Sequence, residues 1–242
     1  MLRIPRFSRE DVNPRFTAEA EIGALFQQFA WEVLLRDFPD LRNFAGSGRD
    51  GAIDQSATYG NLRTVIECKF LGEDGLPRAL KAWREVAAHL SENLADPAGP
   101  PPGQSQYGPW YSREPGIHEY WFCVSSNLGV QGNQDSLRSE IAAFFRDLAR
   151  SRAHLAHLGD LDVAVLDWGA FETRLQNRRT LAFRWFPGAL LAGFAPLDDF
   201  RPAGRFRVYL SPEKLPYYSR ARHHGTALPR MAFSRKRTWS TG

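Results

Sequence analysis

The sequence predicts an α/β domain in which a mixed central sheet is flanked by helices. Helical and strand-like patterns alternate in the order α-β-β-α-β-α-β-(α)-β, and 242 residues are enough for one large core. This order is typical of a single sheet covered by helices. The chain shows no internal repeat, so we expect one main domain over residues 1–210.

The helices are predicted from apolar side chains that recur three and four residues apart. In the first helix, Thr17 is the expected N-cap, and Glu19 and Glu21 lie in the first turns, where the helix dipole favours acidic groups. Pro77 suits the first turn of the second helix. The expected helices span residues 18–36, 77–94, 134–158 and 169–177.

The strands are predicted from short runs rich in β-branched, aromatic and other apolar residues. Gly60-Asn61 separates the first two runs and favours a two-residue hairpin loop, because Gly and Asn tolerate the positive φ of such turns. A Pro/Gly-rich loop is expected over residues 96–118. The expected strands span residues 52–59, 62–70, 118–126, 161–168 and 181–186.

The formal charge of +4 is distributed unevenly along the chain. The segment from Pro212 to Gly242 carries seven Lys or Arg and one acid, a charge of +6, whereas the rest carries −2. We therefore expect residues 211–242 to form a basic linker or tail. A contact with nucleic acid or with a partner is the alternative.

The composition predicts a cytoplasmic protein that does not enter a membrane. No apolar run approaches the ~20 residues that a membrane span needs, and the charged N-terminus lacks the apolar stretch of a secretory signal. Cys68 and Cys123 each lie in an apolar strand-like run, which is typical of buried thiols in a reducing compartment.

The predicted hairpin brings charged side chains together. If Gly60 and Asn61 form the loop, paired positions place Asp54 directly opposite Glu67, and Lys69 falls on the same face. The other face, which includes Tyr59 and Leu62, is expected to point to the core.

Two opposed carboxylates need a shared proton or a bound cation. Oxygen ligands suit Mg²⁺ or Mn²⁺, and such an ion beside a lysine activates water for hydrolysis. The alternative is that Lys69 pairs with Glu67 or Asp54 on a solvated strand face.

The stretch "GSGRDGAIDQ…TVIECKF", preceded and followed by helices, resembles the PD-(D/E)XK superfamily of restriction-endonuclease-like nucleases, and its Mrr-like group in particular. The resemblance covers about residues 18–130 and implies a restriction-endonuclease-like sheet and Mg²⁺-dependent cleavage of double-stranded DNA. It implies that Asp54, Glu67 and the Cys68 carbonyl bind the metal, and that Lys69 assists the attack of water.

The chain departs from that family in its first helix, where a Glu commonly follows a Phe. Gln27 and Gln28 follow Phe26 here. Glu21 or Gln28 is the expected helper residue, although Glu21 is equally explained by the helix dipole.

Further residues are candidates for contact with DNA. Arg78, Lys81 and Arg84 lie on the helix after the second strand, where they either bind phosphates or form a solvated face. Trp110, Tyr111 and Trp121 are candidates for base stacking, with a place in the core as the alternative for Trp121.

The stretches "YWFCVSSNLGVQG", "LAFRWFPG" and "SPEKLPYYSRARHHG" resemble, more loosely, the N-terminal nuclease domains of STAND-type NTPases in antiphage defence. This resemblance implies a defence effector that acts as a homo-oligomer or with a fused or associated NTPase. The chain itself has no G-x-x-x-x-G-K-[ST] loop. A catalytically inactive nucleic-acid-binding or oligomerisation module of the same fold is the alternative function.

Overall fold

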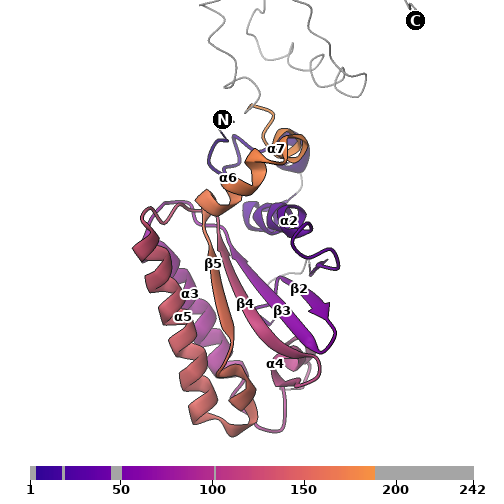
Figure 1. Cartoon of the computed structure of the whole chain (residues 1–242), viewed down its shortest axis with the longest axis vertical. Helices are drawn as coiled ribbons and strands as arrows, with labels where there is room; N and C mark the ends of the chain where they lie inside the picture. The colour runs from indigo at the N-terminus through magenta and orange to yellow at the C-terminus, as the bar shows by residue number, and fades with distance from the viewer. Residues whose placement is uncertain (1–3, 18–19, 45–50, 101, 189–242) are drawn as a thin grey trace, which may run out of the picture. The chain divides into compact units, whose positions relative to one another are not determined.

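A computed structural model of the chain describes residues 4–17, 20–44, 51–100 and 102–188 (Figure 1). The predicted end of the domain near residue 210 and the basic segment 211–242 lie outside these residues. The helices are α1 (Pro14–Thr17), α2 (Ile22–Leu34), α3 (Leu76–Asn93), α4 (Gly108–Tyr111), α5 (Gln131–Ser151), α6 (Trp168–Gln176) and α7 (Arg179–Trp185). The strands are β1 (Arg42–Asn43), β2 (Gln55–Tyr59), β3 (Leu62–Lys69), β4 (Gly116–Val124) and β5 (Asp162–Leu166), and two 3₁₀ turns are η1 (Ser105–Tyr107) and η2 (Ala153–Leu158).

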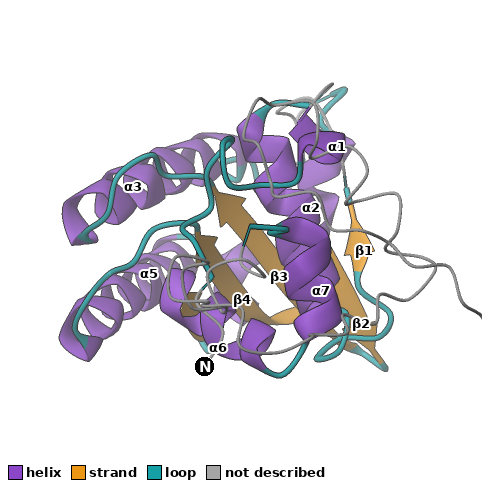
Figure 2. Cartoon of the chain, turned by 90° about the horizontal axis from the view of Figure 1, so that it is seen from above, coloured by secondary structure: helices purple, strands orange, loops and turns teal. Residues whose placement is uncertain are grey.

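The five described strands form one mixed sheet in the order β1-β2-β3-β4-β5. β1, β2 and β3 are antiparallel neighbours, whereas β3, β4 and β5 run parallel (Figure 2). The hairpin therefore forms one side of the sheet, and the parallel strands joined by α3 and α5 form the other. The predicted mixed sheet with flanking helices is confirmed.

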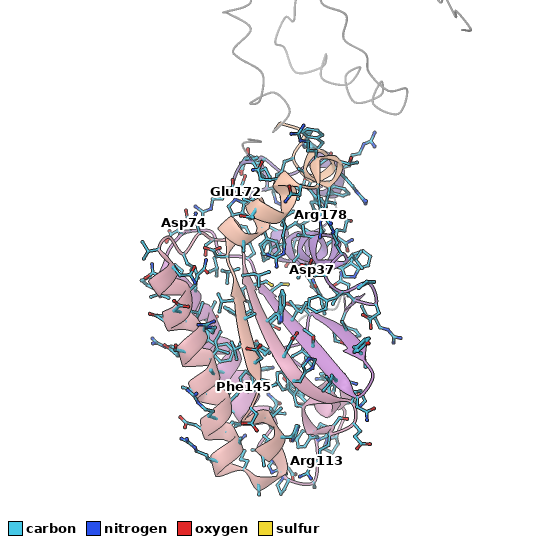
Figure 3. All side chains as sticks on the ribbon, viewed as in Figure 1. Asp37, Asp74, Arg113, Phe145, Glu172 and Arg178 are labelled. Carbon is cyan, nitrogen blue, oxygen red and sulfur yellow. The ribbon has the colours of Figure 1, made fainter. Side chains whose placement is uncertain are left out.

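Helices cover both faces of the sheet. On one face, α3 and α5 lie side by side, with Trp83 of α3 packed against Phe122 of β4 and Phe145 of α5, labelled in Figure 3, packed against Tyr120 of β4. On the other face, α2, α6 and α7 form a second core that includes Phe29 and Trp185. Both faces of β3 are thus buried, which explains why its burial does not alternate along the strand.

The prediction of a strand over residues 181–186 is wrong, because these residues lie in and just after helix α7. A short apolar run cannot be assigned to strand or helix from its composition alone. Tertiary contacts fix the helix here: Ala182 and Trp185, at helical spacing, enter the second core. Arg178, directly before the helix, pairs with Asp37 after α2 at 3.7 Å (Figure 3).

The first helix is shorter than predicted, since it begins at Ile22 and Thr17 belongs to the separate helix α1. Its N-cap is Glu21, whose side chain caps no backbone amide. Cys68 and Cys123 are buried thiols, as predicted. None of the described helices has the length and apolar character needed to cross a membrane.

Candidate active site

The β2–β3 hairpin brings the two predicted carboxylates to its open end, away from the turn. Tyr59 pairs with Leu62 across a loop in which Gly60 adopts a φ of 58°, and the pairing continues to Gln55 and Ile66. One step further, the Asp54 amide donates a hydrogen bond to the Ile66 carbonyl at 3.0 Å. The predicted register is confirmed over residues 55–59 and 62–66, whereas the direct pairing of Asp54 with Glu67 stays a prediction because Asp54 lies just before β2. Alternation beyond Gln55 and Ile66 places both carboxylates on one face of the hairpin.

The alternative interpretation is borne out in part: Lys69 pairs with Glu67, but the face is not solvated at the two carboxylates, which are buried. Asp54 is 6% exposed and Glu67 is 2% exposed. Val65, on the same face, is fully buried in the core beneath α3 and α5. The predicted division into a core face and a polar face also fails at the turn, where Tyr59 is 87% exposed, because the helices do not reach the end of the hairpin.

Lys69 links this buried pair to solvent. Its Nζ lies 2.5 Å from Glu67 Oε1, and its side chain is 37% exposed. Asp54 is held from the other strand, because the Cys68 amide donates to its Oδ2 at 2.6 Å. The three predicted catalytic side chains, Asp54, Glu67 and Lys69, are therefore brought together at the open end of the hairpin, away from the turn. Their catalytic role stays a prediction.

The negative charge of this pair acts on neighbouring buried groups. Burial raises the pKa of the Tyr120 hydroxyl well above its ordinary value, and the charges of Glu67 and Asp54 raise it further. Burial also raises the pKa of the Cys68 thiol, with further contributions from Cys123, Asp54 and Glu67. The Cys68 side chain is therefore a neutral thiol and lies in the core under α2, on the opposite face of the strand from Glu67.

The oxygen atoms at this site fit a hard divalent cation. Asp54 and Glu67 supply carboxylates, and the Cys68 carbonyl lies on the strand edge next to Asp54, because the Cys68 amide that bonds to Asp54 is on that edge. Among the described residues, no group of three or more His, Cys, Asp and Glu side chains is arranged to hold a metal ion. This small donor set is compatible with Mg²⁺, which commonly keeps several waters and binds through one or two carboxylates.

The segment that leads into Asp54 has an unusual backbone. Gly51 and Ala52 adopt φ values of 68° and 59°, and such a conformation at an alanine costs on the order of 1–3 kcal/mol. A Cβ on Gly51 would lie 2.6 Å from the Gln106 carbonyl oxygen. The indole of Trp110, four residues after Gln106, donates to the Gly51 carbonyl at 2.8 Å and anchors the segment as well.

Gln27 is the helical residue that contacts the site, and the sequence interpretation did not select it. Its Nε2 lies 3.0 Å from Asn43 Oδ1, 3.0 Å from the Phe44 carbonyl and 3.1 Å from the Asp54 carbonyl. The position directly after Phe26, where the resembled family commonly has Glu, was the available signal.

The expected helper residues lie elsewhere. Gln28 is hydrogen bonded to Glu32 and Asn43, and Glu32 in turn pairs with Arg184 of α7. Glu21 is exposed at the N-cap of α2. Neither arrangement supports a helper role at the carboxylates, because Gln27 occupies the contact between α2 and Asp54.

We expect Gln27→Glu to lower the free energy of unfolding by about 3 kcal/mol, because a carboxylate would face oxygen acceptors without a donor. Urea unfolding followed by circular dichroism measures this change. Gln131→Glu is the matched control: Gln131 is exposed in the first turn of α5, and its substitution should alter stability by less than about 0.5 kcal/mol. Equal stability of Gln27→Glu and the control would show that the site accepts a helical carboxylate.

The three basic residues predicted to bind DNA are exposed on α3, but each is paired with an acid. Arg78 contacts Glu73 at 2.7 Å, and Arg84 contacts Glu140 at 2.9 Å. Lys81 lies 4.0 Å from Glu85. These pairs support the alternative of a solvated face, although exposed pairs of this kind are weak and DNA phosphates compete with them.

The predicted stacking of Trp110 on bases is wrong, because Trp110 is fully buried against Tyr120 and Phe145. Trp121 packs edge-on against Phe38 beside the second core, which supports its core alternative. Tyr111 stacks on His154 and donates to the Asn93 carbonyl, so its ring already has an intramolecular partner.

Comparisons with known proteins identify no relative of this chain: no family model, no curated protein and no solved structure matches it.

Proposed function

We propose that this chain is a Mg²⁺-dependent DNA endonuclease domain with a restriction-endonuclease-like, PD-(D/E)XK architecture. The observation that carries the proposal is the arrangement of Asp54, Glu67 and Lys69 at the open end of the β2–β3 hairpin. Lys69 neutralises Glu67 at 2.5 Å, whereas Asp54, held by the Cys68 amide, adds a second buried carboxylate whose charge a divalent cation would offset. Mg²⁺ with a lysine beside it is suited to the hydrolysis of phosphodiesters.

In this proposal each residue has a separate task. Asp54, Glu67 and the Cys68 carbonyl would hold Mg²⁺, which supplies Lewis-acid stabilisation of the phosphoryl oxygens. Lys69 reaches solvent, where it would orient the attacking water and stabilise the negative charge that develops on the phosphoryl oxygens. Gln27 fixes the backbone of Asp54, because its neutral side-chain amide donates a hydrogen bond to the Asp54 carbonyl. The burial of Glu67 excludes bulk water from the carboxylates.

We expect purified wild-type protein to convert supercoiled plasmid to nicked and linear forms with Mg²⁺ or Mn²⁺, and to give only background cleavage with EDTA. Gel electrophoresis over a time course measures the rate. Zinc-only and calcium-only reactions control for non-specific stabilisation by a divalent ion. The same reactions are run with the protein held as a dimer by a fused coiled coil, because activation by oligomerisation is part of the proposal.

Binding of duplex DNA without cleavage in any of these reactions would support the inactive module instead. The proposed role as a defence effector with an NTPase partner rests on the looser resemblance, and part of the stretch that carries it lies outside the described residues.

A further inference from the structure

A cavity of about 580 Å³ lies between the candidate active site and the hairpin turn, lined by residues that alternation places on the same face as Asp54 and Glu67. Its lining includes Ser56 and Thr58 of β2 and Arg63 of β3. At ~3.3 Å per residue, Ser56 is about 7 Å and Thr58 about 13 Å along the strand from Asp54. The cavity is thus within a few nucleotides of any strand bound at the carboxylates, since DNA rises ~3.4 Å per nucleotide.

Basic groups from two strands line this cavity. Arg42 of β1 and Arg63 of β3 both contribute, and within the described ranges neither guanidinium forms an ion pair with a carboxylate. Burial lowers the pKa of Arg63, as expected for a cation that has lost water without gaining an anion. Among the described residues of the lining the acid is Asp40, which accepts a hydrogen bond from the Thr58 amide. The cavity is therefore suited to an anionic ligand.

The other lining groups suit a nucleotide. Phe44 is 44% exposed, which is unusual for a large aromatic ring, and it offers a surface on which a base can stack. The hydroxyls of Ser56 and Thr58 and the amide of Gln106 supply hydrogen-bonding groups. A volume of this size is within the range of small-ligand sites.

The wall of the cavity is attached to the segment that carries Asp54. Gln106 packs so closely on Gly51 that a Cβ there would lie 2.6 Å from its carbonyl oxygen, and Trp110 donates to the Gly51 carbonyl. A ligand in the cavity is therefore held at a fixed position relative to the candidate catalytic carboxylates.

We propose that this cavity binds one nucleotide of the DNA strand beside the scissile phosphodiester, with Arg42 and Arg63 on its phosphate and Phe44 stacked on its base. The inference rests on the proposed nuclease function and names the part of the substrate that the neighbouring surface recognises. Guanidinium groups are well suited to phosphate oxygens, and stacking on an aromatic ring accepts any base.

The test is the affinity of the full chain for a fluorescein-labelled 16-nucleotide DNA, single-stranded and duplex, by anisotropy in EDTA at several salt concentrations. Arg42→Ala and Arg63→Ala are each expected to weaken binding about tenfold and to reduce the salt slope by about 0.9. Phe44→Ala is expected to weaken binding about tenfold with no change in slope. Arg138→Ala, an exposed arginine paired with Asp135 on α5, is the matched control and should change neither.

The outcomes separate this inference from the proposed function. Wild-type affinity and slope in the Arg42→Ala/Arg63→Ala double variant, with a native circular dichroism spectrum, overturn the inference and leave the cleavage experiment unaffected. If wild type binds no DNA, calorimetry with 5′-dTMP decides: binding lost in the double variant assigns the cavity to a free nucleotide and removes the support for a nuclease. Absence of both DNA and dTMP binding by wild type overturns the inference as well.

Discussion

Lys69→Ala is expected to reduce the rate of DNA cleavage by about 10²–10⁴-fold, the range for loss of a positioned acid–base group. Lys69 is the member of the triad that reaches solvent, since its side chain is 37% exposed while Glu67 is 2% exposed. It is therefore the group able to contact both the attacking water and the phosphate. Single-turnover cleavage of a labelled duplex with saturating Mg²⁺ measures the effect.

Two further variants make this result specific. Lys69→Met keeps the apolar stem of the side chain and removes only the charge, so it should lose as much activity as Lys69→Ala. Arg150→Ala removes a basic group from the end of α5, where Arg150 is 78% exposed and lies 3.5 Å from Asp147, and should keep the wild-type rate. Affinity for duplex DNA in EDTA should be similar in all of these proteins.

Cleavage by Lys69→Met at the wild-type rate would contradict the assigned role of the lysine. Thermal unfolding is measured in parallel, because removal of Lys69 leaves the buried carboxylate of Glu67 without the cation 2.5 Å from it. A protein that unfolds below the assay temperature is therefore distinguished from one that is folded and inactive.

The hairpin was predictable from the sequence because local chemistry determines it. Gly60 and Asn61 fix the turn, the turn fixes the register, and the register brings Asp54 and Glu67 to the open end of the hairpin. The burial of these residues depends instead on α2, α3 and α5, which are remote in sequence. Alternation along β3 therefore suggested a polar face, whereas Val65 shows that the face is covered by helices.

The contribution of the first helix was not predictable for a related reason. Gln27 and Gln28 are neighbours in sequence and point about 100° apart around the helix. Helical periodicity alone does not determine which of the two contacts the backbone of Asp54. That choice depends on the path of β1, a strand of two residues that the sequence did not indicate. The cavity beside the site was missed for the same reason, because its walls come from β1, the hairpin and η1.

Asp54→Asn is expected to abolish cleavage and yet to make the metal-free protein more stable, by about 1–2 kcal/mol, which is the usual gain from a single stabilising substitution. Asparagine has nearly the same volume as aspartate and keeps an oxygen that accepts the hydrogen bond from the Cys68 amide, now 2.6 Å from Asp54 Oδ2. It removes one of two buried carboxylates at the open end of the hairpin.

Differential scanning calorimetry in EDTA and in Mg²⁺ measures both parts of this prediction. In EDTA the midpoint of Asp54→Asn should exceed that of wild type by roughly 2–8 °C, at 2–4 °C per kcal/mol for a chain of this size. In Mg²⁺ the wild type should gain about 2.7 kcal/mol once the ion reaches a hundred times its dissociation constant. The variant should gain little, because one of its two carboxylate ligands is an amide.

Asp135→Asn is the matched control, since the Asp135 side chain on α5 is 47% exposed and lies 3.1 Å from Arg138. It should show neither the stabilisation in EDTA nor any loss of the response to Mg²⁺. A metal-free Asp54→Asn protein less stable than wild type would mean that the carboxylate is a structural group held by its hydrogen bonds. A cation site built from buried like charges requires both results together: Asp54→Asn is more stable than wild type without metal, and Mg²⁺ adds little to its stability.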